Sequence, residues 1–299
     1  MSTPRITGKA RLAGVLGHPV AHSLSPVLHN YWLERLGVDG AYVPLPVAPD
    51  QFVTAVRGLQ AAGFRGANVT IPHKEAAFAI ADEVAPMARV AGSVNTLVFG
   101  EDGRIRGSST DGFGFLASLE AEGIDIGAVR DRGAALLLGA GGAARSIAAA
   151  LMERGFSVIV TNRTATRARE LVETLSQAWR DHAAGAMPAL STLPWDHPAG
   201  VPADVSLLVN TTSLGMAGGP DASWAPDLTG AADHLIVADI VYVPCETPLL
   251  EAAATRGLTA IGGLGMLLHQ ARPGFRAWFG AEAEVDAATV AYVSAVLKR

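Results

Sequence analysis

Two charged residues in separate polar segments could form a proton-transfer pair. Lys74 ends the segment Asn68-Val69-Thr70-Ile71-Pro72-His73-Lys74, in which a short β-type run is followed by an expected helix start. The dipole of a helix opposes a cation in its first turn, so this lysine is either solvated or held there for chemistry. Asp111 lies in Ser109-Thr110-Asp111-Gly112, where two halves of the chain join. If the two side chains face each other, their opposite charges offset desolvation and they can act as acid and base.

Two hydroxyl groups precede another expected helix. In the segment His22-Ser23-Leu24-Ser25-Pro26, Ser25 is a favourable N-cap and Pro26 a favourable first helical residue. Hydroxyls at a helix N-terminus can hold a carboxylate, although the same pattern also fits plain capping. Three histidines in and beside this segment match no familiar metal-ligand spacing, and no metal site is predicted from them: His18, His22 and His29.

A glycine turn joins an apolar run to a helix in the middle of the chain. The run Leu136–Leu138 is followed by Gly139-Ala140-Gly141-Gly142-Ala143, and a second β-type run ends at Thr161. Glycines let the backbone approach a pyrophosphate, and the N–H groups of the helix start can bind it. Ala144 stands where a third glycine is common, and a purely structural turn is the alternative. The context favours a dinucleotide site.

The residues after Thr161 indicate which dinucleotide is bound. NAD enzymes usually place a carboxylate at this point, about 20 residues beyond the glycine turn, to hold the ribose 2′-hydroxyl. This chain has Asn162-Arg163-Thr164 and then Arg167. Guanidinium groups can form paired hydrogen bonds with a 2′-phosphate, so NADP is favoured over NAD. The alternative is that both arginines are solvated residues of a surface helix.

The elements that carry these groups alternate between β-type and helical patterns. From residue 13 to about 82 the order is β/α/β/α/β/α, followed by a hairpin with the turn Glu101-Asp102-Gly103. The expected segments are Ala13–Gly17, Pro26–Leu36, Tyr42–Val47, Asp50–Ala62, Ala67–Thr70 and Lys74–Ala81, then the hairpin strands Ser93–Phe99 and Arg104–Ser108.

A second alternating unit opens at Ala134 and is typical of a doubly wound parallel sheet. Its expected strands are Ala134–Leu138, Ser157–Thr161, Val205–Asn210, Leu235–Val241 and Leu258–Ile261. The proline-rich stretch Gly185–Pro202 is expected to be mostly irregular. Gly265–Arg299 reads as two helices without a strand. Such a tail cannot extend the second sheet, so we expect it to pack on the first unit.

Composition narrows the class of partner. The 299 residues are 49% hydrophobic and 17% charged, which suits two globular domains. A net charge of −5 gives no basic field for nucleic acid or an anionic membrane, so we expect a small-molecule partner. Cys245 is the only cysteine, and the N-terminus lacks the apolar run of a secretory signal. No apolar stretch reaches about 18 residues. We therefore expect a soluble, cytoplasmic protein.

The polar segments together resemble the shikimate dehydrogenase family over nearly the whole chain. Besides the segments already quoted, the residues that carry the resemblance are Val94-Asn95-Thr96, Asn210-Thr211-Thr212-Ser213 and Gly263-Leu264-Gly265-Met266. The resemblance implies an α/β fold of two α/β domains, with an N-terminal substrate domain and a Rossmann-like doubly wound NADP-binding domain. It also implies C-terminal helices that pack back on the first domain. The implied bounds are 1–111 for the substrate-binding domain, 112–263 for the Rossmann domain and 264–299 for the returning helices.

The resemblance also implies roles for individual residues. Ser23 and Ser25, with help from Tyr242, would hold a carboxylate of the substrate, and Lys74 would be the acid/base residue paired with Asp111. Ring hydroxyls would be bound by Thr70, Asn95, Asp111 and Gln270. The implied cofactor-binding residues are Gly139, Ala140, Gly141, Gly142, Ala143, Asn162, Arg163, Thr164, Arg167, Thr211, Met216 and Gly263. Two departures from the family pattern are Ser109, where asparagine is common, and Pro273, which is expected to interrupt the helix that carries Gln270.

The implied activity is the reversible, NADP-dependent reduction of 3-dehydroshikimate to shikimate, a step of aromatic amino acid biosynthesis, in a monomer or a homodimer. One alternative is a quinate/shikimate dehydrogenase that uses NAD or NADP, and relatives acting on amino- or deoxy-shikimates also stay open. The Ser-Leu-Ser spacing and the two arginines count against the quinate branch. A non-catalytic nucleotide-binding sensor is an alternative of another class, which the presence of both Lys74 and Asp111 counts against.

Overall fold

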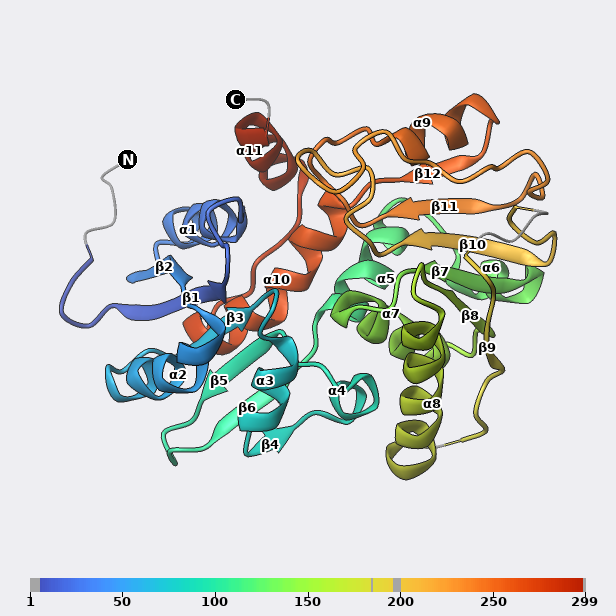
Figure 1. Cartoon of the computed structure of the whole chain (residues 1–299). Helices are drawn as coiled ribbons and strands as arrows, with labels where there is room; N and C mark the ends of the chain where they lie inside the picture. Colours follow the sequence, from blue (N-terminus) through green and yellow to red (C-terminus); the bar gives the residue numbers. More distant parts are fainter. Residues whose placement is uncertain (1–5, 184, 196–199, 298–299) are drawn as a thin grey trace. The chain divides into compact units, whose positions relative to one another are not determined.

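The computed structural model of the chain describes residues 6–183, 185–195 and 200–297 (Figure 1). The chain divides into two compact units. The first contains the residues up to Thr110 together with those from Leu268 onward, and the second is Asp111–Leu267. Among the described residues, no helix combines the length and the apolar character that crossing a membrane requires.

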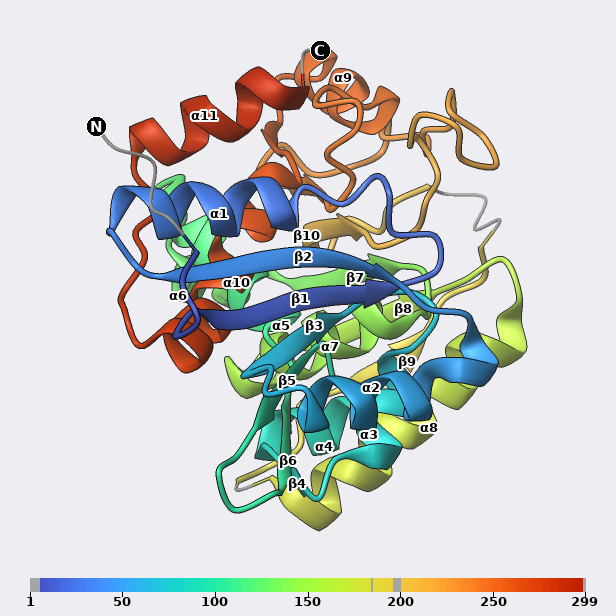
Figure 2. The same cartoon turned by 90° about the vertical axis from the view of Figure 1, so that its left-hand side faces the viewer.

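The first unit is built on a six-stranded mixed sheet in the order β2-β1-β3-β5-β6-β4. Parallel pairs join β1 to β2 and to β3, whereas β5 runs antiparallel to both β3 and β6. Figure 2 faces this unit and shows α1 lying along β2. The strands are β1 (Arg11–Gly17), β2 (Gly40–Pro46), β3 (Gly66–Val69), β4 (Glu83–Val84), β5 (Thr96–Phe99) and β6 (Ile105–Ser108). The helices of residues 25–91 are α1 (Ser25–Arg35), the 3-10 turn η1 (Pro49–Gln51), α2 (Phe52–Ala61), α3 (Lys74–Ile80) and α4 (Pro86–Ala91).

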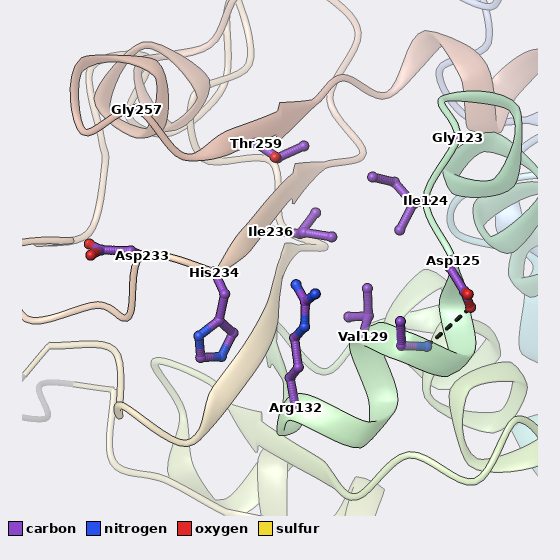
Figure 3. Close-up of a pocket in the computed structure, with 11 residues that line it drawn as sticks. Gly123, Ile124, Asp125, Val129, Arg132, Asp233, His234, Ile236, Gly257 and Thr259 are labelled. Atoms are coloured by element: carbon purple, nitrogen blue, oxygen red, sulfur yellow. Dashed lines mark hydrogen bonds between the residues drawn. The ribbon is translucent and has the colours of Figure 1, made fainter.

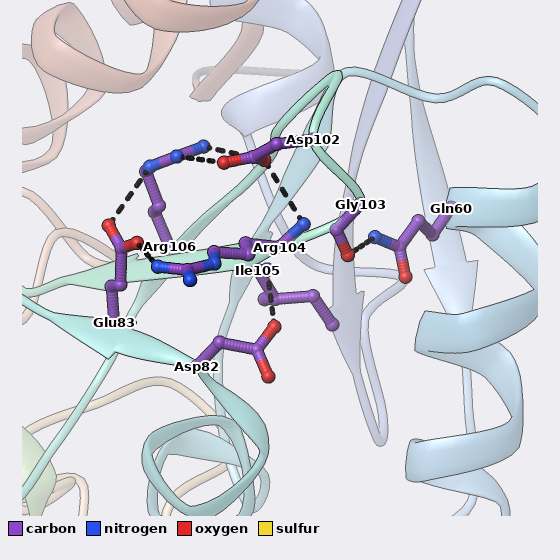
Figure 4. A network of polar contacts seen from close by, with 8 residues as sticks. All are labelled: Gln60, Asp82, Glu83, Asp102, Gly103, Arg104, Ile105 and Arg106. Atoms are coloured by element: carbon purple, nitrogen blue, oxygen red, sulfur yellow. Dashed lines mark hydrogen bonds and ion pairs between the residues drawn. The ribbon is translucent and has the colours of Figure 1, made fainter.

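The β5–β6 hairpin, predicted from its turn residues, is tied to β4 by ion pairs (Figure 4). The two carboxylate oxygens of Glu83 pair with different arginines. One lies 2.7 Å from the Nη1 of Arg104 and the other 3.1 Å from the Nε of Arg106. Arg106 also pairs with Asp102 in the turn. The hydrogen bond from Arg104 lowers the pKa of Glu83, and the bond from Arg106 lowers that of Asp102. These groups are exposed, so the network orients the hairpin and adds little free energy of folding.

The C-terminal helices pack on the first unit, as expected. They are α10 (Leu264–Phe279) and α11 (Ala287–Leu297). The indole N–H of Trp278 donates to the carbonyl of Leu97 at 2.9 Å, and Arg35 forms an ion pair with Asp286 at 2.6 Å. The expected interruption at Pro273 is wrong, because α10 continues through this residue. A proline inside a helix removes one backbone hydrogen bond, and the buried aromatic side chains of α10 compensate for the loss.

The second unit is a doubly wound parallel sheet in the order β12-β11-β10-β7-β8-β9. Read from β9, this is the 3-2-1-4-5-6 order of a Rossmann fold, whose direction reverses between β7 and β10. The strands are β7 (Ala134–Leu138), β8 (Val158–Thr161), β9 (Leu190–Thr192), β10 (Val205–Asn210), β11 (Ile236–Asp239) and β12 (Thr259–Ile261). The helices are α5 (Asp111–Ala121), α6 (Ile126–Arg132), α7 (Gly142–Glu153), α8 (Ala165–His182) and α9 (Pro248–Thr255). Burial is complete along β7 and β10, which form the centre of the sheet.

Three short elements were not expected from the sequence. The stretch Gly185–Pro202 contains β9, which pairs with β8 at the edge of the sheet. β4 has two residues, and α4 follows it at Pro86. These elements are too short for a clear hydrophobic period, so their pairing partners define them rather than their own sequence.

Candidate active site

The serine pair lies at the start of α1, but not in the expected geometry. The helix begins at Ser25, and the N-cap position is Leu24, without a side-chain cap. Instead, the Oγ of Ser23 accepts a hydrogen bond from the backbone N–H of Ser25 at 3.3 Å. Ser25 is buried, and its hydroxyl is hydrogen-bonded to Tyr42. The prediction of Ser25 as an N-cap is therefore wrong, since its side chain is engaged by β2 rather than by the helix start.

The loops that carry Ser23 and Thr70 lie against each other. They follow β1 and β3, which are parallel neighbours, so both loops leave the sheet at the same edge. The N–H of His18 donates to the carbonyl of Ile71 at 3.0 Å. A Cβ on Gly17 would come within 2.5 Å of the Thr70 methyl group. Only glycine lets the two loops approach this closely, and Ser23 and Thr70 are thereby brought to one edge of the sheet.

Lys74 is the first residue of α3, as predicted. Its carbonyl accepts a hydrogen bond from the N–H of Val94 at 3.1 Å. The N–H of Asn95, the residue after Val94, donates to the carbonyl of Ser108 at 3.1 Å. The half-buried lysine is thus fixed at its backbone beside the segment that carries Asn95.

Asn95, Thr110 and Gln270 form one buried polar cluster. The Nδ2 of Asn95 lies 3.0 Å from the Oγ1 of Thr110 and 3.5 Å from the Oε1 of Gln270. Thr110 in turn lies 3.3 Å from Gln270. Asn95 is 3% exposed and Gln270 is 9% exposed. The family resemblance assigned Asn95 and Gln270 to the substrate, and the fold brings these residues together across 175 positions of sequence.

Asp111 and Tyr242 belong to the second unit. Asp111 is the first residue of α5 and is buried. Tyr242 follows β11 and is half-buried, and burial raises the pKa of its hydroxyl. The pairing of Asp111 with Lys74, which lies in the first unit, stays a prediction.

The glycine turn lies at the switch point of the second sheet. Gly139 has a φ of +112°, and a Cβ there would come within 2.7 Å of the Thr211 hydroxyl. Thr211 is fixed in turn by donating its hydroxyl to the carbonyl of Leu138 at 2.7 Å. At the start of α7, the N-cap is Gly141. No described residue caps it with a side chain or comes within 4 Å of the position that a Cβ would take. The first N–H groups of α7 thus have no capping side chain and could donate to a phosphate.

The other predicted cofactor residues lie in loops at the carboxyl ends of neighbouring strands. Asn162 follows β8 and donates to the carbonyl of Thr164 at 2.9 Å, which shapes the turn into α8. Arg163 and Arg167 are exposed at this turn. Met216 lies in the loop after β10, and Gly263 follows β12. A Cβ on Gly263 would come within 2.3 Å of the Ile240 carbonyl, so glycine is required for this approach.

Asn210 organises the loop that carries Thr211. Its Oδ1 accepts hydrogen bonds from the N–H and the hydroxyl of Thr212, at 3.0 and 2.7 Å. Its Nδ2 donates to Asp239 at 3.0 Å. Burial raises the pKa of Asp239, although three hydrogen bonds to its carboxylate oppose that change. A polar residue at the end of the buried strand β10 thus positions the loop by hydrogen bonds rather than by packing.

A hollow of about 350 Å³ lies at the amino ends of two strands of the second sheet (Figure 3). Its lining includes Ile236 and Thr259, the first residues of β11 and β12. Parallel α/β sheets bind nucleotides at the carboxyl ends of their strands. The hollow is therefore separate from the loops of Gly139, Arg163 and Thr211.

The doubly wound second unit, with its glycine turn at the switch point, places the protein in the class of two-unit α/β proteins with a Rossmann-type nucleotide unit. Family models extend this assignment. Residues 15–97 match the shikimate dehydrogenase substrate binding domain, and residues 126–188 match shikimate/quinate 5-dehydrogenase. Residues 263–289 match the shikimate 5′-dehydrogenase C-terminal domain. The chain belongs to the shikimate dehydrogenase family.

Three similar proteins differ in their sequence identity to this chain and in their named activity. A shikimate dehydrogenase (NADP(+)) of Acidiphilium cryptum is 56% identical over 98% of this chain and 99% of its own. A crystal structure of shikimate 5-dehydrogenase from Thermus thermophilus, in complex with NADP(H) and shikimate, is 36% identical with a TM-score of 0.79, over 97% of this chain and 99% of that one. The ligand-free 5-ketofructose reductase of a Gluconobacter species is 29% identical with a TM-score of 0.83, over 97% and 100%.

Proposed function

We propose that this protein is an NADP-dependent shikimate dehydrogenase, which reversibly reduces 3-dehydroshikimate to shikimate. The observation that carries the proposal is the 56% identity, over almost the full length of both chains, to a protein named for that activity. Ser23 and Thr70 follow two parallel strands of the first sheet, and this supports a substrate site there, to which Asp111 and Tyr242 of the second unit would contribute. The candidate residues for cofactor follow strands of the second sheet.

In the proposed substrate site, different residues bind the carboxylate, the ring hydroxyls and the ketone of the ligand. Ser23 and Ser25, with Tyr242, hold the carboxylate by hydroxyl hydrogen bonds, for which the Ser25 hydroxyl turns from Tyr42 to the ligand. Thr70, Asn95, Asp111 and Gln270 bind the ring hydroxyls. Lys74, paired with Asp111, provides the proton to the oxygen of the ketone as it becomes an alkoxide, and accepts it in the reverse direction.

The second unit fits a dinucleotide because its glycine turn leaves room beside the start of α7. When bound, NADPH supplies the hydride for the ketone carbon. The segment Gly139–Ala143 would hold the pyrophosphate, and Thr211, Met216 and Gly263 would line the remainder of the site. Asn162, Arg163, Thr164 and Arg167 would hold the adenosine end, with the two arginines on the 2′-phosphate.

Substrate choice tests the proposal directly. We expect the purified protein to oxidise shikimate with NADP at least severalfold faster than it oxidises quinate, because the Ser23/Ser25 pair suits shikimate. The assay measures NADPH formation with each substrate, repeated with NAD, and measures NADPH consumption with 5-ketofructose. Equal rates on shikimate and quinate would favour the quinate/shikimate branch, and activity on 5-ketofructose alone would replace the proposed substrate. Nucleotide binding without turnover of any of them would favour a sensor.

Arg163 is the main test of cofactor choice. If Arg163 and Arg167 bind the 2′-phosphate, Arg163→Ala should weaken NADP binding by about tenfold to a hundredfold and leave NAD binding nearly unchanged. Titration calorimetry with each nucleotide measures both constants. Arg169→Ala is the matched control, since it removes the same charge from an exposed position later in α8. Equal weakening of NADP and NAD would mean that Arg163 supports the adenine pocket or the fold.

We further propose a small-molecule partner only, without nucleic acid, and a cytoplasmic location. The net charge of −5 and the single, exposed Cys245 are consistent with both. The protein is expected to be a monomer or a homodimer, which light scattering after size-exclusion chromatography distinguishes.

A further inference from the structure

Four buried polar side chains form a hydrogen-bonded series across the first sheet. The hydroxyl of Tyr42, in β2, lies 2.6 Å from the Oδ1 of Asn68, in β3. The Nδ2 of Asn68 lies 3.2 Å from the carbonyl of Asn95 and 3.2 Å from the Oγ1 of Thr96. All four residues are at most 5% exposed. Tyr42 and Asn68 have no role in the function proposed above.

The partners of Asn68 allow only one orientation of its amide. A backbone carbonyl can only accept, so the NH2 group must face Asn95, and the oxygen must face Tyr42. Tyr42 therefore donates its proton to Asn68. The second N–H of Asn68 is donated to Thr96, which leaves the Thr96 proton for the Oδ1 of Asn95, at 3.0 Å.

This series and the backbone of Thr110 together fix the orientation of the Asn95 side chain. Its Oδ1 accepts from Thr96 and from the backbone N–H of Thr110, which is 2.8 Å away. The Nδ2 is thereby a donor that faces Thr110 and Gln270, with the Thr110 hydroxyl at 3.0 Å and the Gln270 oxygen at 3.5 Å. A ligand oxygen held by Asn95 must accept a hydrogen bond, which a ring hydroxyl can do.

The ring of Tyr42 is held in place by packing. His29 stacks on it in parallel, with a centroid distance of 4.0 Å and an interplanar angle of 2°. The hydroxyl of Tyr42 also bonds to Ser25, so one oxygen contacts the proposed substrate-binding residue Ser25 and the strand β3, which Thr70 follows.

We propose that Tyr42 is a positioning residue, which acts through Asn68 and Thr96 to hold the Asn95 amide with its NH2 group toward the substrate. The proposal rests on the proposed function for the identity of the ligand. It differs from a purely structural role in one respect: the effect of losing the hydroxyl must pass through Asn95.

The test is Tyr42→Phe, which removes the hydroxyl and keeps the stacked ring. We expect the KM for shikimate to rise by about tenfold, the loss of roughly one hydrogen bond to the ligand, with kcat and NADP affinity changed far less. In an Asn95→Ala background, Tyr42→Phe should have almost no further effect on KM, because the group through which it acts is gone. An unchanged KM for Tyr42→Phe, or fully additive effects in the double variant, would overturn the proposal.

Two further variants keep the test decisive. Thr96→Val interrupts the same series at its last step, and it should reproduce the rise in KM if Tyr42→Phe does not fold. Tyr292→Phe is the matched control, since it removes a hydroxyl from an exposed tyrosine of α11.

A second measurement separates this proposal from the proposed function. The side-chain NH2 signal of Asn95 in an NMR spectrum, assigned by its loss in Asn95→Ala, should shift in Tyr42→Phe and not in Tyr292→Phe. An unshifted signal would overturn the role of Tyr42 whatever the substrate. A parent protein that does not oxidise shikimate would overturn the proposed function alone.

Discussion

Lys74→Ala is expected to lower the kcat of shikimate oxidation by about 10²–10⁴, the usual effect of losing a general acid or base. The KM for shikimate should change much less, because the side chain would act mainly in the transition state. The backbone bond from Val94 to the Lys74 carbonyl is independent of the side chain, so the start of α3 is expected to stay intact. Steady-state kinetics on the pure variant measure both constants.

Lys9→Ala is the matched control for this variant, because Lys9 is exposed and lies outside every candidate site. Asp111→Asn should lower kcat in the same direction if the two residues act as a pair, and the double variant should lose less than the sum. A Lys74→Ala enzyme with a near-normal kcat would identify Lys74 as a surface cation or a binding group.

The second large effect concerns stability in acid and depends on His29. This side chain is fully buried in the first unit, and neither ring nitrogen has a hydrogen-bond partner among the residues that the structure describes. Burial lowers the pKa of His29 from 6.5 to about 3. Well above pH 6.5 the ring is neutral in both the folded and the unfolded chain, so stability there does not depend on its titration. Between these two values the unfolded chain binds a proton that the folded one excludes, so the free energy of unfolding falls as the pH is lowered.

The expected loss is about 1.4 kcal/mol per pH unit, or roughly 2 kcal/mol between about pH 6.5 and pH 5. Urea unfolding at several pH values measures it. His29→Phe keeps a ring against Tyr42 and should flatten the dependence, whereas His234→Phe, at an exposed position, should not. The carboxylates with shifted pKa values titrate in the parent and in the variant alike, so the difference between the two proteins isolates the contribution of His29. An equally steep dependence in His29→Phe would contradict the assignment.

Long apolar runs made the second sheet predictable. β7 and β10 have the expected bounds because they are buried along their whole length, so the apolar run and the strand coincide. β9 was missed because it is an edge strand of three residues with prolines on both sides. In the first unit, the prediction of Ser25 as an N-cap was wrong because the hydroxyl of Tyr42, in β2, binds the Ser25 side chain.

The site was predictable only in part from residue patterns. The glycine turn and the two arginines could be identified from their spacing along the chain. Gln270 could not, because its partner Asn95 is 175 residues away, and only the family resemblance placed it in the site. Tyr42 was missed, although one signal was present: Asn68 is a polar residue in a strand of otherwise apolar, buried positions, and such a residue needs a partner. The likeness of fold alone does not select a substrate, since the 5-ketofructose reductase has a TM-score of 0.83.

The chain leaves the first unit at Thr110 and re-enters it at Leu268. During synthesis on the ribosome, the second unit is therefore complete before the first. The indole that donates to Leu97 and the amide that contacts Asn95 are both supplied by α10, after more than half of the chain has emerged. Until then the β3–β5 part of the first sheet lacks the hydrogen bond and the cover that Trp278 supplies, and such exposed surface favours aggregation. The first unit is thus completed by a segment that is translated after the whole of the second unit.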